Sequence, residues 1–250
     1  MKMRAYISTL ILVCTMAHGK ITNPAILKIG HRGACGYAPE NTLLSFKIAL
    51  NMNVSMIEFD VHQCATGQTV VIHDETVDRT TNGSGEVEKM ALEQLKALDA
   101  GQGEKIPTLQ EVLDLADHKA MVNIELKGKN TAAPVARIID EYVHTKGWDY
   151  NDFVISSFDH EQLYEIHALK PQLRIAILNH KLPEHYRFMV KDLAAESINL
   201  KHINITQEII YELHSQNIKI CAWTVNNLQD IVRLASWGID GIFSDFPDRL

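Results

Sequence analysis

Two acidic residues at the end of one apolar segment are the most chemically informative feature of the sequence. Glu58 and Asp60 lie near the end of the run 54–61, whose β-branched and large apolar residues are typical of a buried parallel strand. Because side chains alternate along a strand, both acids point to one side while Phe59 points to the other. Burying two like charges together is costly unless a positive charge lies between them. Taken alone, the pair is equally compatible with a solvated strand end.

A second strand end repeats this pattern. Glu125 and Lys127 close another apolar run, 121–126. Three carboxylates and a lysine, presented by two strand ends, indicate a divalent cation with an anion beside it. Hard oxygen ligands of this kind favour Mg²⁺ or Ca²⁺ over zinc.

The elements that would position these residues alternate between strands and helices. Strands are predicted over 25–29, 54–61, 121–126, 153–156, 173–178, 196–200, 218–225 and 241–244. Helices are predicted over 43–50, 109–116, 134–143, 160–168, 186–193, 207–213 and 228–235. Strict alternation implies a parallel sheet, and eight units in about 225 residues indicate an α/β fold, a closed (β/α)8 TIM barrel. An open doubly wound sheet is the alternative, although no Gly-x-Gly-x-x-Gly follows the first strand.

Residues 62–107 interrupt the alternation. They contain a short strand (69–72), a polar, glycine-rich stretch (78–85) and a helix-like segment (90–98). We interpret them as a small insertion subdomain after the second strand, within a barrel domain that spans 26–250. The chain beyond the last strand is too short for a full eighth outer helix.

In such a barrel all strands end on one face, and active sites are built there. The residues that this rule gathers are His31, Arg32, Glu58, Asp60, His73, Asp74, Glu125, Lys127, Ser157, Trp223, Ser244 and Asp245. Arginine binds phosphate in bidentate fashion and lysine binds it as a point charge, while paired histidines suit general acid–base catalysis near neutral pH. The absence of Walker, kinase and Gly-x-Ser-x-Gly motifs favours hydrolysis of an existing phosphate ester.

The ordered motifs resemble those of the glycerophosphodiester phosphodiesterase family of bacterial type. They are His31-Arg32-Gly33, Pro39-Glu40-Asn41-Thr42, Glu58-x-Asp60, His73-Asp74, Arg79-Thr80-Thr81-Asn82-Gly83, Pro107-Thr108-Leu109, Glu125-x-Lys127, Trp223-Thr224-Val225-Asn226 and Asp240-Gly241-Ile242. The resemblance implies a TIM barrel with an insertion after strand 2, and hydrolysis of glycerophosphodiesters to glycerol 3-phosphate and an alcohol.

The same resemblance implies a role for each residue of the predicted site. His31 and His73 would form the acid–base pair. Glu58, Asp60 and Glu125 would bind a divalent cation, Mg²⁺ or Ca²⁺. Arg32 and Lys127 would hold the phosphate, and Trp223 would line the pocket. Two alternatives remain: a related toxin-type enzyme resembling phospholipase D, and a phosphate-binding barrel without catalysis.

The remaining sequence features concern partners and location. A net charge of -7 argues against a general nucleic-acid binder.

A secretory signal peptide is predicted over 1–19 from basic residues at 2 and 4, an apolar run over 5–17 and small residues near 19. We therefore expect export to the periplasm or medium, with a cytoplasmic location as the alternative. The four cysteines match no Cys-x-x-Cys pattern and imply no disulfide framework. No stretch after the leader predicts a transmembrane segment, and the oligomeric state is left open.

Overall fold

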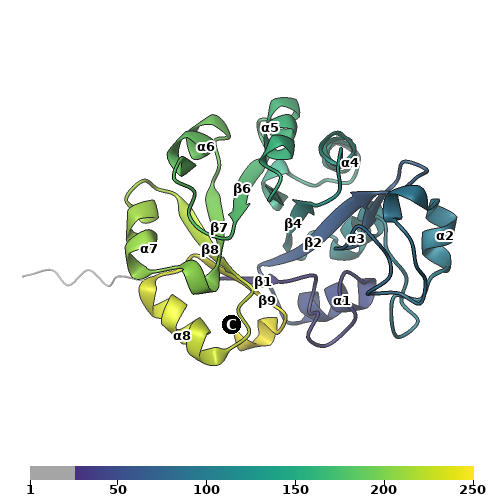
Figure 1. The fold of residues 1–250 in the computed structure, drawn as a ribbon, viewed down its shortest axis with the longest axis horizontal. Coiled ribbons are helices and arrows are strands. Elements are labelled where there is room, and N and C mark those ends of the chain that lie inside the picture. Colours follow the sequence, from purple (N-terminus) through teal and green to yellow (C-terminus); the bar gives the residue numbers. More distant parts are fainter. Residues whose placement is uncertain (1–25) are drawn as a thin grey trace, which may run out of the picture.

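The computed structural model describes residues 26–250, which form a closed barrel of parallel strands (Figure 1). Its strands are β1 (Leu27–Gly30), β2 (Met56–Gln63), β3 (Thr69–Val71), β4 (Met121–Leu126), β5 (Phe153–Ser157), β6 (Arg174–Asn179), β7 (Ser197–Lys201), β8 (Lys219–Trp223) and β9 (Gly241–Ser244). All except β3 pair in parallel around the barrel, and β9 pairs with β1 to close it. The predicted (β/α)8 TIM barrel is confirmed.

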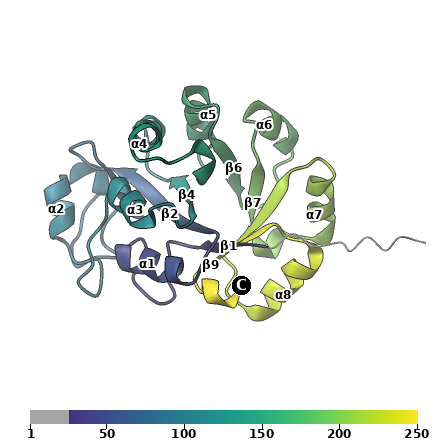
Figure 2. The same ribbon diagram turned by 180° about the vertical axis from the view of Figure 1, so that it is seen from behind.

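Helices surround the barrel and connect successive strands (Figures 1 and 2). They are α1 (Leu43–Asn51), α2 (Leu92–Ala97), α3 (Leu109–Ala116), α4 (Ala132–Thr145), α5 (His160–Leu169), α6 (Tyr186–Asp192), α7 (Gln207–His214) and α8 (Leu228–Trp237). Short 3-10 turns lie at η1 (Val87–Lys89), η2 (Tyr150–Asp152), η3 (His202–Asn204) and η4 (Pro247–Arg249). Helix α3 begins at a capping box, in which the side chains of Thr108 and Glu111 each accept a hydrogen bond from the other residue's backbone N–H.

The packing of one aromatic pair fixes which way the end of β2 faces. Phe59 is fully buried against Phe46 of α1, with ring centroids 5.5 Å apart in an edge-to-face arrangement. Because side chains alternate, Glu58 and Asp60 therefore point into the barrel. The parallel register of β2 and β4 sets Asp60 directly beside Glu125.

The segment between β2 and α3 has a small core of its own. β3 pairs antiparallel with the end of β2, and η1 and α2 follow it. Its buried apolar residues are Cys64, Val70, Ile72, Val77, Val87, Leu95, Ala100 and Ile106, a cluster separate from the main core. Figure 1 shows α2 at the outer edge of the molecule, beyond α1 and α3.

Most differences from the predicted elements are shifts of one or two residues at the ends. The strand predicted over 218–225 is shorter, because Thr224 and Val225 already belong to the loop that follows β8. After β9 the chain forms only the turn η4, and Leu250 packs against the main core. The predicted signal peptide lies outside the described residues. Within 26–250, none of the helices is both long and apolar enough to cross a membrane.

Candidate active site

Three buried carboxylates meet inside the mouth of the barrel. Oxygen atoms of Glu58, Asp60 and Glu125 all lie within 4.8 Å of one another. Burial, followed by repulsion from Asp60, raises the pKa of Glu58 well above its usual range and that of Glu125 to about 7. The charged forms of these groups are disfavoured by burial and by their mutual repulsion, and a hard divalent cation bound between them would offset both. The donor set therefore fits Mg²⁺ or Ca²⁺.

The groups that partner these carboxylates come from two loops, the one between β1 and α1 and the one that follows β4. The backbone N–H of Arg32 donates to Glu58 at 2.9 Å, and Arg32 Nε lies 3.5 Å from Asp60. Asn41 Nδ2 donates to Asp60 at 2.9 Å, and Lys127 Nζ donates to Glu125 at 3.0 Å. Each donor leaves other lone pairs of its carboxylate free for a cation.

The loop after β1 adopts an uncommon backbone conformation to reach this position. Arg32 has φ +50, a left-handed conformation that costs a non-glycine residue about 1–2 kcal/mol. Gly33 follows with φ +83, and a Cβ there would lie 2.6 Å from the backbone carbonyl carbon of Ser45 in α1. This close approach requires glycine, and in the same turn the N–H of Arg32 donates to Glu58.

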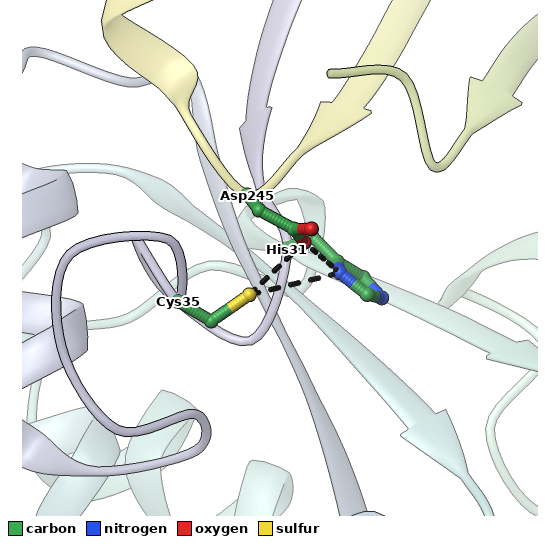
Figure 3. Close-up of side chains that lie close together, drawn as sticks. All are labelled: His31, Cys35 and Asp245. Carbon is green, nitrogen blue, oxygen red and sulfur yellow. Dashed lines mark hydrogen bonds and ion pairs between the residues drawn. The ribbon is translucent and has the colours of Figure 1, made fainter.

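The first histidine is held by a carboxylate from the far end of the chain. His31 Nδ1 lies 2.6 Å from Asp245 Oδ1, and Cys35 Sγ donates to the same oxygen at 3.0 Å (Figure 3). Burial alone would raise the pKa of Asp245, but the hydrogen bonds from His31, Cys35 and Asn226 lower it below its usual range. An ionised Asp245 places the ring proton of His31 on Nδ1, so Nε2 is left free to exchange a proton.

The second histidine has a matching arrangement. His73 Nδ1 lies 2.6 Å from Asp74 Oδ1, and the guanidinium of Arg79 holds the pKa of Asp74 well below its usual range through bonds of 2.7 and 3.0 Å. Burial lowers the pKa of His73, so a neutral ring is favoured near pH 7. Both histidines thus present Nε2 as the free ring nitrogen.

These groups surround a cavity of about 480 Å³. Its lining is His31, Arg32, Glu58, His73, Asn123, Glu125, Lys127, Ser156, Phe158, Leu178, His180, Trp223, Thr224 and Phe243. One wall is aromatic: the ring centroids of Phe158, His180 and Trp223 lie 5.3 to 5.4 Å apart. Trp223 is fixed because its Nε1 donates to the carbonyl oxygen of Asn199 at 3.1 Å.

The structure brings the predicted site residues together in one place. Of the eight residues with a predicted role, all but Asp60 line the cavity, and Asp60 lies in the carboxylate cluster with Glu58 and Glu125. Sequence reasoning gave no role to Glu40, Arg79, Phe158 or His180. Phe158 and His180 directly follow β5 and β6, so the strand-end rule applied to every strand finds them. Glu40 and Arg79 belong to two of the family-like motifs in the sequence, but nothing in the sequence indicates a role for either residue.

Comparison with known proteins gives a consistent result. A sequence profile of the Glycerophosphoryl diester phosphodiesterase family matches residues 31–249. A glycerophosphodiester phosphodiesterase of Caldanaerobacter subterraneus subsp. tengcongensis is 38% identical over 236 residues, covering 90% of this chain and 96% of the relative. One from Bacillus subtilis is 33% identical over 264 residues, covering 94% and 89%. A solved Oleispira antarctica phosphodiesterase, in complex with the product sn-glycerol-3-phosphate, is 29% identical with a TM-score of 0.82, covering 88% of this chain and 93% of that one.

Proposed function

Because the chain belongs to the glycerophosphoryl diester phosphodiesterase family, we propose that it hydrolyses glycerophosphodiesters to glycerol 3-phosphate and an alcohol, with a divalent cation and two histidines. The observation that carries the proposal is the pair of carboxylate-anchored histidines, His31 and His73, facing one cavity with three clustered acids. A binding protein without catalysis would need neither proton-transfer pair.

The proposed substrate is a small molecule. A cavity of about 480 Å³ falls in the range of small-molecule sites, which span roughly 300–1,000 Å³. The related Oleispira antarctica enzyme holds sn-glycerol-3-phosphate, the product expected here. Arg32 and Lys127 supply positive charge for the phosphate, and the apolar faces of Trp223 and Phe158 suit carbon–hydrogen groups of the substrate.

Glu58, Asp60 and Glu125 would hold the cation, Mg²⁺ or Ca²⁺. When bound, it would neutralise charge on the phosphate oxygens. Lys127, paired with Glu125 at 3.0 Å, adds a second positive charge at the same end of the cavity.

The two histidines would divide the proton transfers between them. With Nδ1 committed to an aspartate, each ring acts only through Nε2, so one histidine can accept a proton while the other donates one. The pairing to Asp245 and to Asp74 stabilises the imidazolium that forms in each case. It also holds the ring in a fixed orientation.

The attacking group is proposed to be the substrate's own glycerol hydroxyl. Cys35 is a poor nucleophile, because burial and its bond to Asp245 raise the pKa of the thiol, and Cys64 and Cys221 are buried. Attack by a neighbouring hydroxyl is effectively unimolecular and gains several kcal/mol from proximity. A cyclic phosphate forms as the alcohol leaves, and water then opens it with the histidines in exchanged roles.

The test is a panel of glycerophosphodiesters that differ in the alcohol, incubated with Mg²⁺ or Ca²⁺. We expect release of glycerol 3-phosphate and the free alcohol. Sphingomyelin is included, because its cleavage in place of the glycerophosphodiesters would identify a toxin-type enzyme. Saturable binding of the whole panel without turnover in either metal would refute the proposal and favour a binding protein.

A further inference from the structure

A second group of metal-ligating side chains lies beside the carboxylate cluster. Among residues 26–250, only two groups bring three such side chains within 4.8 Å: the three acids, and His31, Cys35 and Asp245. Figure 3 shows Cys35 and Asp245 converging on His31. The carboxylate cluster offers only oxygen, whereas this group offers one sulfur, one nitrogen and one oxygen.

The ligand set is that of zinc. Tetrahedral zinc with Zn–S of about 2.3 Å and Zn–N or Zn–O of about 2.0 Å places N and O about 3.3 Å apart and S about 3.5 Å from each. The observed separations are 2.6 Å for His31 Nδ1 to Asp245 Oδ1, 3.0 Å for Cys35 Sγ to Asp245 Oδ1 and 4.0 Å for Cys35 Sγ to His31 Nδ1. Each differs from the tetrahedral value by less than about 1 Å, which small side-chain rotations can supply.

All three side chains are also reachable. None is fully buried, so solvent reaches each of them and a bound zinc ion could keep water in its fourth position. Asn226 Nδ2 donates to Asp245 Oδ2 at 2.6 Å, which leaves Oδ1 as the oxygen directed at His31 and Cys35. The outer contacts of the ligand carboxylate are therefore already in place.

We propose that Cys35, His31 and Asp245 form an inhibitory binding site for zinc, separate from the Mg²⁺ or Ca²⁺ site of the three acids. Binding displaces one proton from the Cys35 thiol to solvent and forms the thiolate–zinc bond. The ring of His31 must bind zinc through the Nδ1 lone pair, so its proton moves by solvent exchange to Nε2. His31 then cannot accept a proton at Nε2. This inhibitory step rests on the proposed role of His31, whereas the binding step does not.

The binding step is tested with Co²⁺, which takes zinc sites and reports a thiolate ligand by charge-transfer absorption in the near ultraviolet. The protein is first saturated with Mg²⁺ to occupy the three acids, and Co²⁺ is then titrated. We expect the band in the wild-type protein and in Cys64→Ser, and its loss in Cys35→Ser, where the hydroxyl can still donate to Asp245. No band in the wild-type protein, which needs no variant to interpret, or a band that persists in Cys35→Ser, would overturn the proposal.

The inhibitory step is tested by titrating Zn²⁺ into the Mg²⁺-saturated enzyme, with each protein normalised to its own zinc-free rate. We expect half-maximal inhibition of Cys35→Ser to require at least about tenfold more Zn²⁺ than the wild type. Equal inhibition of both would place the inhibitory ion at the three acids and overturn the proposal. If no diester is hydrolysed at all, the proposed function fails, and the Co²⁺ band still decides whether the site exists.

Discussion

Arg32 and Arg79 donate to the same carboxylate oxygen of Glu40, Arg32 Nη1 at 2.7 Å and Arg79 Nη2 at 2.8 Å. Arg79 continues to Asp74, which in turn holds His73. An arginine of the segment between β2 and α3 thus joins the proposed phosphate-binding arginine to the second histidine. The chain of ion pairs therefore links the loop after β1 to the inserted segment, which contains Arg79, Asp74 and His73.

This relationship predicts that Arg79→Gln lowers kcat by about 10- to 100-fold with little change in KM. Arg79 does not line the cavity, so substrate contacts stay intact, but Asp74 loses its cation and Glu40 keeps only Arg32. Steady-state kinetics on the best glycerophosphodiester measures kcat and KM separately. Added guanidinium ion should restore part of the lost kcat.

Arg187→Gln is the matched control. Arg187 of α6 pairs with Glu212 of α7 at 3.0 Å, and its side chain is 65% exposed. Its loss should change neither kcat nor KM beyond error. An Arg79→Gln enzyme with wild-type kcat would show that His73 does not depend on the ion pairs of Arg79.

The three-carboxylate cluster predicts dependence on a divalent cation. Excess chelator should abolish turnover, and readdition of Mg²⁺ or Ca²⁺ should restore it. Glu58→Gln removes one charged ligand and should weaken metal affinity by at least about tenfold, measured by calorimetric titration. Full turnover of the wild-type enzyme in excess chelator would contradict this expectation.

The raised pKa of Glu125 predicts how metal-free stability depends on pH. Its pKa is about 7 in the folded chain and about 4.3 in the unfolded chain, so the folded state binds more protons between these values. Stability contributed by protonated Glu125 is therefore present below about pH 4 and is lost as pH rises through about 7. In chelator, Glu125→Gln should remove this loss, so its Tm relative to wild type should rise by at least about 2 °C between pH 5 and 8.

Other groups titrate over the same interval, so the informative quantity is the difference between the two proteins at each pH. His73, whose pKa is lowered by burial, contributes the opposite slope in both. At pH 8, saturating Mg²⁺ should raise the Tm of the wild-type protein well above its value in chelator, and should raise the Tm of Glu125→Gln only slightly. A constant difference in Tm across the pH range would contradict the prediction.

Attack by the glycerol hydroxyl predicts that a 2-deoxy substrate analogue binds comparably but turns over at least about a hundredfold more slowly. Removing the hydroxyl takes away the nucleophile and leaves the phosphate contacts to Arg32 and Lys127 intact. Competition against the parent diester gives the affinity, and release of the alcohol gives the rate. Hydrolysis of the analogue at the parent rate would establish direct attack by water.

The predicted signal peptide over 1–19 implies a mature chain that begins near Lys20 and is exported, to the periplasm if the host is a Gram-negative bacterium. N-terminal sequencing and intact mass of protein purified from each cell fraction measure both claims. A chain that retains Met1 and is recovered from the cytoplasm would contradict them.

The sequence was sufficient to predict the architecture of the barrel. Alternation of short β-branched runs with amphipathic segments predicts eight parallel strands, and parallel strands end on one face. That single geometric rule brings His31, Glu58 and Glu125 into one cavity. The prediction works because burial patterns within one strand or helix are local.

The contacts that complete the site depend on loops instead. Asp245 reaches His31 across 214 residues of sequence, and Arg79 reaches Glu40 across 39. No periodicity encodes which loop side chain meets which, because the distances depend on backbone conformations such as the left-handed Arg32. Trp223 of the aromatic wall was predicted, whereas Phe158 and His180 were not, because the strand-end rule was not applied to the residues that directly follow β5 and β6.

The closure of the barrel through β1 and β9 means that the proposed catalytic pair of His31 and Asp245 forms only when the last strand is in place. Gly30 pairs with Ser244, and the next residues on each side are His31 and Asp245. During synthesis, the ribosome must release nearly the whole polypeptide before β9 can settle between β8 and β1. A nascent chain in which β9 has not yet paired with β1 therefore lacks the contact between Asp245 and His31. The pairing of β9 with β1 that closes the barrel also brings Asp245 to His31.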